Sequence, residues 1–283
     1  MKPPPFDYVR PGTAAEAVAL LAADEDARPL AGGQSLLPMM NFRLARPSTL
    51  VDIGRLPELT ELHRDGDVLV IGAAARQRAV ETSPLVAQTC PLLPAVLRHV
   101  GHHQIRARGT IGGSLAHADP AAELCAAASA LDAEVVAASP TAQRTVDTAA
   151  LLLAPYQTTL HPDEIITETR WPILPRARHG FAEISHRSGD FALAGTAAVV
   201  EFDGAEVARA RLAGLGIAGT VRRLPDAEQV LLNRALTAES ITEAAEAAAA
   251  SVDPPEDVHA DPATRRAALR AATRRALEQM RHD

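Results

Sequence analysis

The chain has 283 residues, 47% of them apolar and 3% aromatic, so it can form one large domain or about two ordinary ones with sizeable cores. A net charge of -7 and a pI near 5.8 exclude the basic surface that nucleic-acid binding needs. No apolar run approaches the length of a membrane span and residues 1–6 contain no secretory signal core, so we expect a cytoplasmic protein.

The cysteine pattern excludes a metal cluster held by this chain alone. Cys90 and Cys125 are the only two cysteines, and they are far apart in the sequence without C-x-x-C spacing. An iron–sulfur cluster or a structural zinc site needs more thiolate ligands at closer spacing. We therefore expect both thiols to be buried among apolar side chains.

The first glycine-rich segment follows a predicted strand–helix–strand unit. Residues 13–16 read Thr-Ala-Ala-Glu, a capping box that predicts a helix to about Ala23. Arg28–Ala31 then predicts a strand, which leads into Ala-Gly-Gly-Gln-Ser at residues 31–35. In α/β folds, loops at such strand ends usually bind ligands.

Two further strands and a broken helical stretch follow. Residues 50–53 and 68–72 are apolar runs that predict strands. The segment 78–100 is predicted to be mostly helical, with interruptions at its three prolines, Pro84, Pro91 and Pro94.

The second glycine-rich segment, Arg108–Ser114, is the centre of the sequence. Its core Ile-Gly-Gly-Ser (111–114) resembles the first segment and follows Arg106 and Arg108. Asp119 is predicted to cap a helix that begins at Pro120 and ends near Leu131. The positive end of that helix would favour a bound phosphate.

Together, the two segments predict a diphosphate-binding site. Adjacent glycines let backbone N–H groups approach an anion closely, and each such bond to a charged oxygen contributes about 1.5–3 kcal/mol. Neither segment matches the Rossmann fingerprint or the P-loop motif. The sequence thus favours a diphosphate-linked cofactor and disfavours a Rossmann domain or an NTPase.

The pattern changes near residue 173, which we take as a domain boundary. Before it, 134–137 and 164–167 are predicted strands that flank a helix-like segment at 147–152. After it, a hairpin-like pattern precedes helices, which indicates a separate α+β layer. The predicted strands are 181–187, 193–202 and 207–217, and the predicted helices are 225–232, 237–250 and 262–280.

Two clusters of polar residues have both a functional and a structural interpretation. His99, His102 and His103 have no carboxylate nearby in the sequence, which favours exposed or hydrogen-bonded histidines over a metal site. The last helix contains several arginines that could dock an acidic partner, but we favour the interpretation that they form a solvent-exposed helix face. These arginines are Arg265, Arg266, Arg270, Arg274 and Arg275.

With both segments identified, nearly the whole chain resembles the FAD-binding medium subunit of molybdenum hydroxylases, such as carbon monoxide dehydrogenase, also found fused into xanthine dehydrogenases. The motifs that carry this resemblance occur in the family's order. They are Phe6-Asp7-Tyr8, Arg10-Pro11, AGGQSLLPMM (31–40), Leu44-Ala45, Leu50-Val51-Asp52-Ile53, IRARGTIGGSLAHADPAAEL (105–124) and SGDFALAG (188–195).

The resemblance implies an α+β protein in two parts. Residues 1–173 would form a FAD-binding domain of the vanillyl-alcohol-oxidase (PCMH) type, an α/β region with subdomains at about 1–55 and 56–173. Residues 174–283 would form a C-terminal domain with a three-stranded antiparallel sheet and a helical bundle. FAD would bind between the two.

The resemblance also implies site residues. Two segments would contact the diphosphate, Glu123 would bind the adenosine ribose, Ile166 would pack near the adenine, and Phe191 would lie beside the isoalloxazine. The cofactor-binding positions are therefore Ala31, Gly32, Gly33, Gln34, Ser35, Leu36, Thr110, Ile111, Gly112, Gly113, Ser114, Asp119, Glu123, Ile166 and Phe191. No side chain is expected to act as a catalytic acid or base, because FAD is the reactive group.

The chain departs from the family pattern at two places. Gln34 replaces a His or Thr, and Ala182 and Glu183 occupy positions where several relatives carry a lysine near the flavin. Without the lysine, a positive charge near the flavin is missing, and the identity of the electron acceptor stays open.

We expect a heterotrimer in which a small iron–sulfur subunit and a large molybdopterin subunit carry the other cofactors, while FAD here passes electrons to an external acceptor. Two alternatives are a self-sufficient FAD-dependent oxidoreductase and a flavin-free scaffold or assembly protein.

Overall fold

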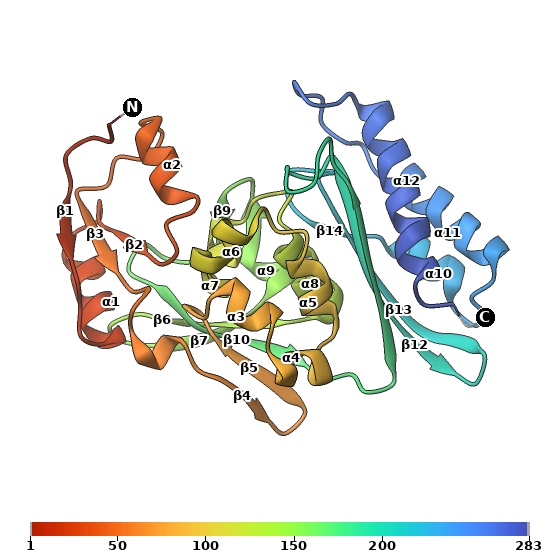
Figure 1. The fold of residues 1–283 in the computed structure, drawn as a ribbon, viewed down its shortest axis with the longest axis horizontal. Coiled ribbons are helices and arrows are strands. Elements are labelled where there is room, and N and C mark those ends of the chain that lie inside the picture. Colours follow the sequence, from red (N-terminus) through yellow and green to blue (C-terminus); the bar gives the residue numbers. More distant parts are fainter. Residues whose placement is uncertain (1, 282–283) are drawn as a thin grey trace.

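The computed structural model describes residues 2–281 and arranges them in three successive parts (Figure 1). The N-terminal part ends with strand β3, the middle part ends with strand β10, and the C-terminal part begins with strand β11. The strands of the described residues form sheets of three, five, four and two strands. The α+β fold expected from the sequence is confirmed.

The N-terminal part is a small parallel sheet with the order β1-β3-β2 and one helix against it. Helix α1 begins as predicted, because the Thr13 hydroxyl accepts a hydrogen bond from the Glu16 amide at 3.1 Å. Glu16 Oε2 in turn accepts from the Gly12 amide at 2.6 Å. The elements of this part are β1 (Asp7–Val9), α1 (Ala14–Ala23), β2 (Arg28–Leu30), α2 (Leu36–Asn41) and β3 (Thr49–Asp52).

The middle part is an antiparallel sheet with the order β4-β5-β10-β6-β7, packed against short helices. The expected interruptions occur at Pro84, which begins α4, and at Pro91, the N-cap of α5. The interruption expected at Pro94 is wrong, because Pro94 lies within the first turn of α5. The sequence analysis missed β7, in which only Val146 is buried. The elements are η1 (Pro57–Leu59), β4 (Leu62–Asp65), β5 (Val68–Gly72), α3 (Gln77–Glu81), α4 (Pro84–Thr89), α5 (Leu92–Leu97), α6 (His103–Arg108), α7 (Ile111–His117), α8 (Glu123–Leu131), β6 (Glu134–Ala138), β7 (Gln143–Asp147), α9 (Thr148–Leu151), β8 (Leu152–Ala154), β9 (Gln157–Thr158) and β10 (Ile165–Pro172).

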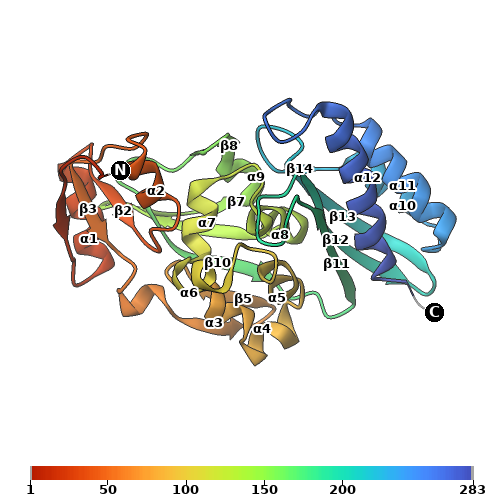
Figure 2. The same cartoon turned by 45° about the horizontal axis from the view of Figure 1, so that its top comes forward.

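The C-terminal part is an antiparallel sheet that has helices on both faces (Figure 2). Helices α10 to α12 cover one face, and α8 of the middle part packs on the other. The three long predicted strands are present, and a short fourth strand, β14, extends the sheet. The elements are β11 (Ala177–Ile184), β12 (Ala194–Asp203), β13 (Glu206–Leu215), β14 (Arg222–Arg223), α10 (Pro225–Leu231), α11 (Ala238–Ala250) and α12 (Pro262–Glu278).

The outer edge of β11 is occupied by one side chain. β11 pairs only with β12, so its other edge has no neighbouring strand. Gln279 lies beside this edge, where its Oε1 accepts from the Phe181 amide at 3.0 Å and its Nε2 donates to the Phe181 carbonyl at 2.9 Å. A side-chain amide thereby satisfies one residue of the edge as a paired strand would.

Arg265 is the exception to the solvated arginine face expected for the last helix. Its side chain is 6% exposed, and Nη1 donates to the carbonyls of Leu193 at 2.6 Å and Gly216 at 2.9 Å. Nη2 pairs with Asp257 at 2.6 Å. Arg265 therefore joins α12 to the ends of two strands, whereas Arg270 forms an exposed pair with a glutamate.

The expectation that both cysteines are buried is confirmed. Cys90 and Cys125 are both buried free thiols, and burial raises the pKa of the Cys90 thiol to about 12. Within residues 2–281, no group of His, Cys, Asp and Glu side chains could hold a metal ion. None of the helices in residues 2–281 combines the length and the apolar character needed to cross a membrane.

Candidate cofactor-binding site

The two glycine segments, far apart in the sequence, lie against each other. A β-carbon at Gly32 would be 2.5 Å from the Arg108 carbonyl oxygen and 2.9 Å from the α-carbon of Gly109. A β-carbon at Gly113 would be 3.6 Å from that of Ala31. The fold thus brings the predicted diphosphate-binding segments to one place, where the N-terminal part meets the middle part.

Arg76 holds this junction together. Its Nη1 donates to the Arg108 carbonyl and its Nη2 to the Gly54 carbonyl at 2.9 Å. Partial burial, with Arg108 close by, lowers the pKa of the Arg76 guanidinium from its usual value. The role of Arg76 was not predictable from the sequence, because a single arginine before a predicted helix carries no signal of its tertiary partners.

The first segment offers a row of free backbone donors. Within residues 2–281, the amides from Gly32 to Leu36 form no hydrogen bond. The turn is closed instead by its carbonyls, since Leu37 N–H donates to the Gly33 carbonyl and Gln34 Nε2 to the Gly32 carbonyl at 3.1 Å. Gly33 has φ +71°, a conformation that favours glycine. This segment has the free donors that bind phosphate.

The second segment differs from the expected loop. Residues 111–117 form helix α7, capped by the Thr110 hydroxyl, which accepts from the Gly113 amide at 3.1 Å. The amides of Ile111 and Gly112 donate to the carbonyls of Ala75 and Ala73. The amides of Ile111 and Gly112 are therefore used by residues 73–75 and that of Gly113 by Thr110, so none of the three is free as expected for a phosphate-binding loop. Their assignment to the cofactor stays a prediction.

Two other donors of the second segment remain available. Among the described residues, neither the Thr110 amide nor the Ser114 hydroxyl forms a hydrogen bond. Gly112 serves close packing, because its β-carbon would lie 2.5 Å from that of Ala73. The second segment thus presents one amide and one hydroxyl beside the five amides of the first.

The helix after the second segment begins later than predicted. Ala118, with φ +50°, ends α7, and Asp119 Oδ1 accepts from the Ala121 amide at 2.8 Å. Asp119 therefore stabilises a turn, and Ala122 is the N-cap residue of α8. The predicted cap is wrong because Asp-Pro favours a turn as readily as a helix start. The Pro120 carbonyl accepts from Gly216 N–H at 2.9 Å, which links this turn to the C-terminal part.

Glu123 is placed at the first position of α8 with a free carboxyl group. Partial burial raises its pKa to about 8, and the nearby charges of Glu183 and Asp119 add to this effect. Its own backbone amide donates to this carboxyl group, and no other hydrogen bond of the Glu123 side chain occurs within the described part of the chain. A carboxyl group in this state can hydrogen-bond a ligand hydroxyl.

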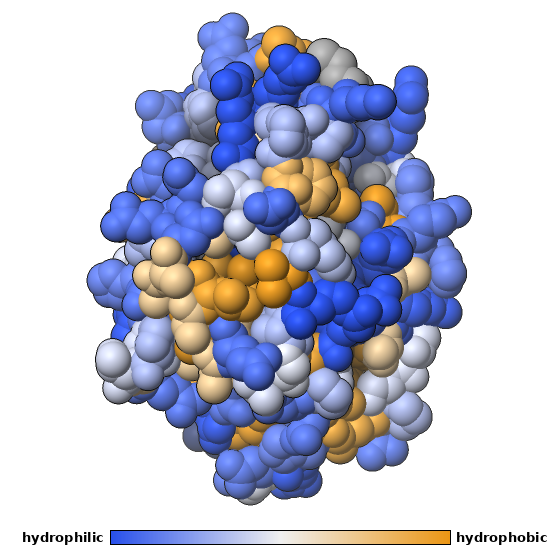
Figure 3. Space-filling model, turned by 90° about the vertical axis from the view of Figure 1, so that its left-hand side faces the viewer, coloured by the Kyte–Doolittle hydropathy of each residue, from blue (hydrophilic) through white to orange (hydrophobic). Residues whose placement is uncertain are grey.

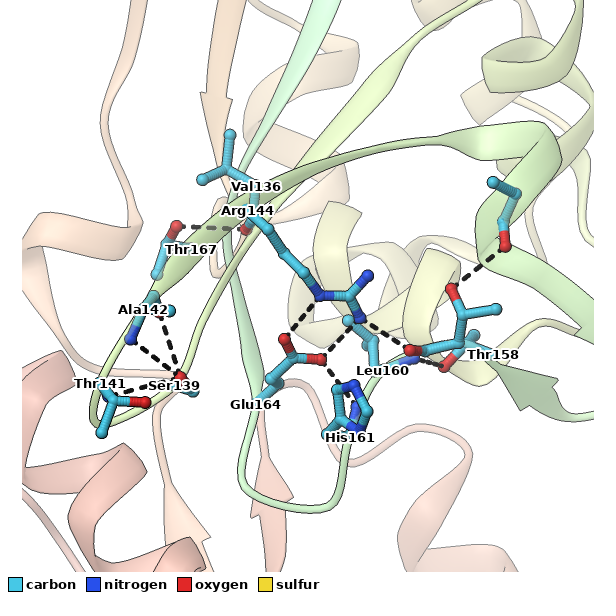
Figure 4. A network of polar contacts seen from close by, with 12 residues as sticks. Val136, Ser139, Thr141, Ala142, Arg144, Thr158, Leu160, His161, Glu164 and Thr167 are labelled. Atoms are coloured by element: carbon cyan, nitrogen blue, oxygen red, sulfur yellow. Dashed lines mark hydrogen bonds and ion pairs between the residues drawn. The ribbon is translucent and has the colours of Figure 1, made fainter.

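Ile166 lies in β10, and a polar network fixes the turn before that strand (Figure 4). Arg144 of β7 binds both carboxylate oxygens of Glu164, at 2.7 and 2.8 Å, and donates to the Thr159 carbonyl at 2.7 Å. The His161 amide also donates to Glu164 at 2.7 Å. Ile166 itself is 4% exposed and belongs to the main apolar core, so only a small part of it can contact a ligand.

Phe191 is 75% exposed in the loop between β11 and β12. This loop is anchored at Gly189, where a β-carbon would lie 2.5 Å from the His102 ring. His102 is the N-cap of α6, which ends beside the second glycine segment. The loop with Phe191 therefore lies against the helix that leads to that segment.

The two residues at the family's lysine position point to opposite faces of β11. Ala182 packs in the core beneath α10 to α12, whereas Glu183 faces the middle part. The Glu183 side chain is 4% exposed, and its Oε1 lies 3.3 Å from His99 Nδ1, while Oε2 has no partner among the described residues. Both residues line a cavity of about 540 Å³, together with Phe181, Arg275, Glu278 and Gln279. His99 is thus hydrogen-bonded, in agreement with the structural interpretation of the histidines.

Comparison with known proteins gives this geometry a context. Residues 4–174 match the family model described as the FAD binding domain in molybdopterin dehydrogenase, and residues 179–280 match the CO dehydrogenase flavoprotein C-terminal domain. The chain is 41% identical to the 6-hydroxypseudooxynicotine dehydrogenase complex subunit alpha of Paenarthrobacter nicotinovorans, covering 100% of this chain and 96% of that protein. It is 37% identical to the carbon monoxide dehydrogenase medium chain of Hydrogenophaga pseudoflava, covering 98% and 97%.

Solved structures agree with these matches. Carbon monoxide dehydrogenase from Hydrogenophaga pseudoflava contains a chain that superposes with a TM-score of 0.95 at 38% identity and 98% coverage of both chains. Quinoline 2-oxidoreductase from Pseudomonas putida 86 contains another, with a TM-score of 0.95 at 36% identity and coverage of 98% and 97%. The chain therefore belongs to the family of FAD-binding medium subunits of molybdenum hydroxylases, the group that includes the carbon monoxide dehydrogenase medium chains.

Proposed function

We propose that the protein is the electron-transfer subunit of a heteromeric molybdenum hydroxylase, passing electrons from the iron–sulfur clusters of a partner subunit through FAD to an external acceptor. The row of free amides from Gly32 to Leu36, beside the second glycine segment, is the observation that carries the proposal. The family to which the chain belongs also supports the proposal that it is an oxidoreductase subunit that works with other chains.

The donor set fits a diphosphate. Gly32, Gly33, Gln34, Ser35 and Leu36 would bind it through their amides, and Ser35, Thr110 and Ser114 would add donors from the two sides. Gly113 packs closely on this donor set, since a β-carbon there would lie 2.6 Å from the Thr110 hydroxyl oxygen. The Glu123 carboxyl group would bind the ribose, Ile166 would border the adenine, and Phe191 would cover the isoalloxazine.

The other part of the proposal concerns what this chain does for the reaction. When bound, FAD supplies the change between one-electron and two-electron chemistry. The chain binds and orients the cofactor and supplies no catalytic acid or base. Molybdenum cofactor and iron–sulfur clusters would be carried by a large and a small partner subunit. We further propose that residues 1–173 and 174–283 are the two folding domains.

Removing the two unpaired hydroxyls tests the site. We expect Ser35→Ala with Ser114→Ala to lower FAD affinity at least tenfold, because two bonds to charged oxygens are lost. The matched control is Ser139→Ala, whose hydroxyl bonds to Ala142 in an exposed turn. FAD affinity would be measured by fluorescence titration of the purified protein. Unchanged affinity in the double variant would contradict the assignment.

The role as a subunit needs a separate measurement. The chain would be purified from its native cells, and the preparation analysed for flavin, iron and molybdenum. We expect all three to co-elute with this chain and two others. A yellow chain that elutes alone and oxidises an organic substrate would instead support a self-sufficient oxidoreductase.

A further inference from the structure

The sequence motifs at residues 6–8 and 50–53, which lie outside the two glycine segments, are joined by one hydrogen bond. The Tyr8 hydroxyl of β1 donates to Asp52 Oδ2 at the end of β3. Asp52 is 8% exposed, whereas Tyr8 is 49% exposed. β1 is an edge strand, and Figure 3 shows the face over this part of the molecule, where apolar side chains interrupt a hydrophilic surface. The surface ring of Tyr8 therefore reaches a buried acceptor through its hydroxyl.

The Asp52 carboxylate fixes the turn that follows β3. Its Oδ1 accepts from the Gly54 amide at 3.0 Å, which closes the turn at the second residue after the aspartate. The Ile53 amide donates to the Leu30 carbonyl at 3.0 Å and ties the same turn to the end of β2. Because the Tyr8 hydroxyl holds the other carboxylate oxygen, the Asp52 side chain is bound at both oxygens and its orientation is fixed.

The turn at residues 52–54 supports the first glycine segment. A β-carbon at Gly54 would lie 2.4 Å from the Ala31 carbonyl oxygen, so the two backbones are in direct contact. This contact lies immediately before the row of free amides that begins at Gly32. Hydrogen bonds weaken steeply when their angle departs from linear, so several amides can bind one diphosphate well only if their backbone is held in place. A shift of the turn would therefore move these donors away from the ligand.

The same turn reaches the second glycine segment through Arg76. The Gly54 carbonyl accepts from Arg76 Nη2 at 2.9 Å, and Arg76 Nη1 donates to the Arg108 carbonyl. The negative charge of Asp52 opposes the lowering of the Arg76 pKa that burial causes, which favours the charged guanidinium. Hydrogen bonds thus run from the Tyr8 hydroxyl through Asp52, the Gly54 backbone and Arg76 to the junction of the two segments.

We propose that Tyr8 and Asp52 are positioning residues for FAD, which hold the turn at residues 52–54 and, through it, the free amides of residues 32–36. This inference rests on the proposed function. Asp52 acts through the Gly54 amide, and Tyr8 acts through Asp52. The hydrogen bond to Asp52 raises the pKa of the Tyr8 phenol above its ordinary value, so the hydroxyl stays protonated as the donor at neutral pH.

A double-mutant cycle on FAD affinity tests the order of these contacts. Tyr8→Phe keeps the ring and removes only the hydroxyl, and we expect FAD affinity to fall about fivefold. Asp52→Ala removes both hydrogen bonds and should lower the affinity by about tenfold or more. Asp52→Asn should lose less than Asp52→Ala, because its side-chain oxygen can still accept from the Gly54 amide. Adding Tyr8→Phe to Asp52→Ala should cause no further loss, since Tyr8 acts only through Asp52.

The chain offers a matched control at the opposite end of β3. The Ser48 hydroxyl donates to Asp24 Oδ2 at 2.6 Å, which is also a bond between a hydroxyl and a carboxylate. Ser48→Ala should lower the free energy of unfolding as Tyr8→Phe does, yet leave FAD affinity unchanged. Hydrogen–deuterium exchange of the FAD-free protein gives a readout that does not depend on the cofactor. Tyr8→Phe should speed exchange of the Ile53 and Gly54 amides, and Ser48→Ala should not.

The measurements separate a positioning role from a general effect on the fold. The proposal is overturned if Tyr8→Phe binds FAD as tightly as wild type, or if the losses from Tyr8→Phe and Asp52→Ala add. It is also overturned if Ser48→Ala loses as much affinity as Tyr8→Phe, because FAD binding would then follow the stability of the N-terminal sheet. Tyr8→Phe and Ser48→Ala decide the question even if Asp52→Ala does not fold. A wild-type chain that binds no FAD would instead refute the proposed function, and this inference with it.

Discussion

Gly32 lies so close to Arg108 that a β-carbon at residue 32 would be 2.5 Å from the Arg108 carbonyl oxygen. The requirement for glycine here comes from close approach between two segments of backbone, and neither can move without disturbing a strand end or a helix end. This contact fixes the distance between the free amides of the first segment and the donors of the second.

We expect Gly32→Ala to force the two segments apart. The added methyl group meets backbone atoms, so the variant should lose at least tenfold in FAD affinity and about 1–3 kcal/mol in the free energy of unfolding. Gly12→Ala is the control, because the new methyl group would meet only the flexible end of Glu16 at 3.3 Å. FAD titration and urea unfolding check the prediction, and equal behaviour of the two variants would count against it.

Arg76→Leu should loosen the same junction without adding bulk. The carbonyls of Arg108 and Gly54 lose their charged donor, which is expected to cost about 2–3 kcal/mol of stability. Arg55→Leu serves as a control, since its side chain is 68% exposed and its 3.9 Å contact with Asp52 should contribute less than about 0.5 kcal/mol. Urea unfolding of both variants gives the comparison, and similar losses would show that Arg76 is not specific to the junction.

Glu123 should make the stability of the FAD-free protein depend on pH. Its folded-state pKa of about 8 lies above the ordinary 4.5, so the native state holds this proton more tightly than the unfolded state does. The contribution of Glu123 to stability is present below about pH 4.5 and is lost as the pH rises through about 8. Glu123→Gln has no ionisable group at this position, so its free energy of unfolding should not fall over this pH range. Its stability relative to wild type should therefore rise between pH 5.5 and 8.5.

Urea unfolding at several pH values measures this difference. Glu168→Gln provides a comparison, because Glu168 already pairs with Arg170 at 2.8 Å and lies on the neighbouring sheet. If the wild type and Glu123→Gln showed parallel pH profiles, the raised pKa would be refuted.

Arg265→Leu should destabilise the C-terminal part most strongly. The change removes the donor to two carbonyl groups at the ends of β12 and β13 and breaks the ion pair with Asp257, whose Oδ1 still accepts from two backbone amides. The expected loss is about 2–4 kcal/mol. Arg270→Leu, which breaks an exposed pair with Glu246, should cost less than about 1 kcal/mol. Differential scanning calorimetry would compare them, and a small loss for Arg265→Leu would contradict the role assigned to this side chain.

The sequence predicted those elements whose signals are local. The capping pattern at residues 13–16 located α1, and apolar patterning located the three long C-terminal strands and the helices after them. It did not predict that the amides of residues 111 and 112 would be used by residues 73–75, because that pairing depends on the tertiary fold. The start of α8 was misplaced for a related reason, since the Asp119 carboxylate can cap a helix or close a turn.

The side-chain amide of Gln279 also determines how the edge of β11 responds to proteolytic cleavage. An open strand edge can act as a template for another chain, and here the last residues of the molecule shield it at Phe181. Cleavage after Glu278 would remove Gln279 and leave the amide and carbonyl of Phe181 without their partner at this edge. An edge without this cover offers hydrogen-bonding groups to a strand of another chain, so cleavage at this point would favour aggregation.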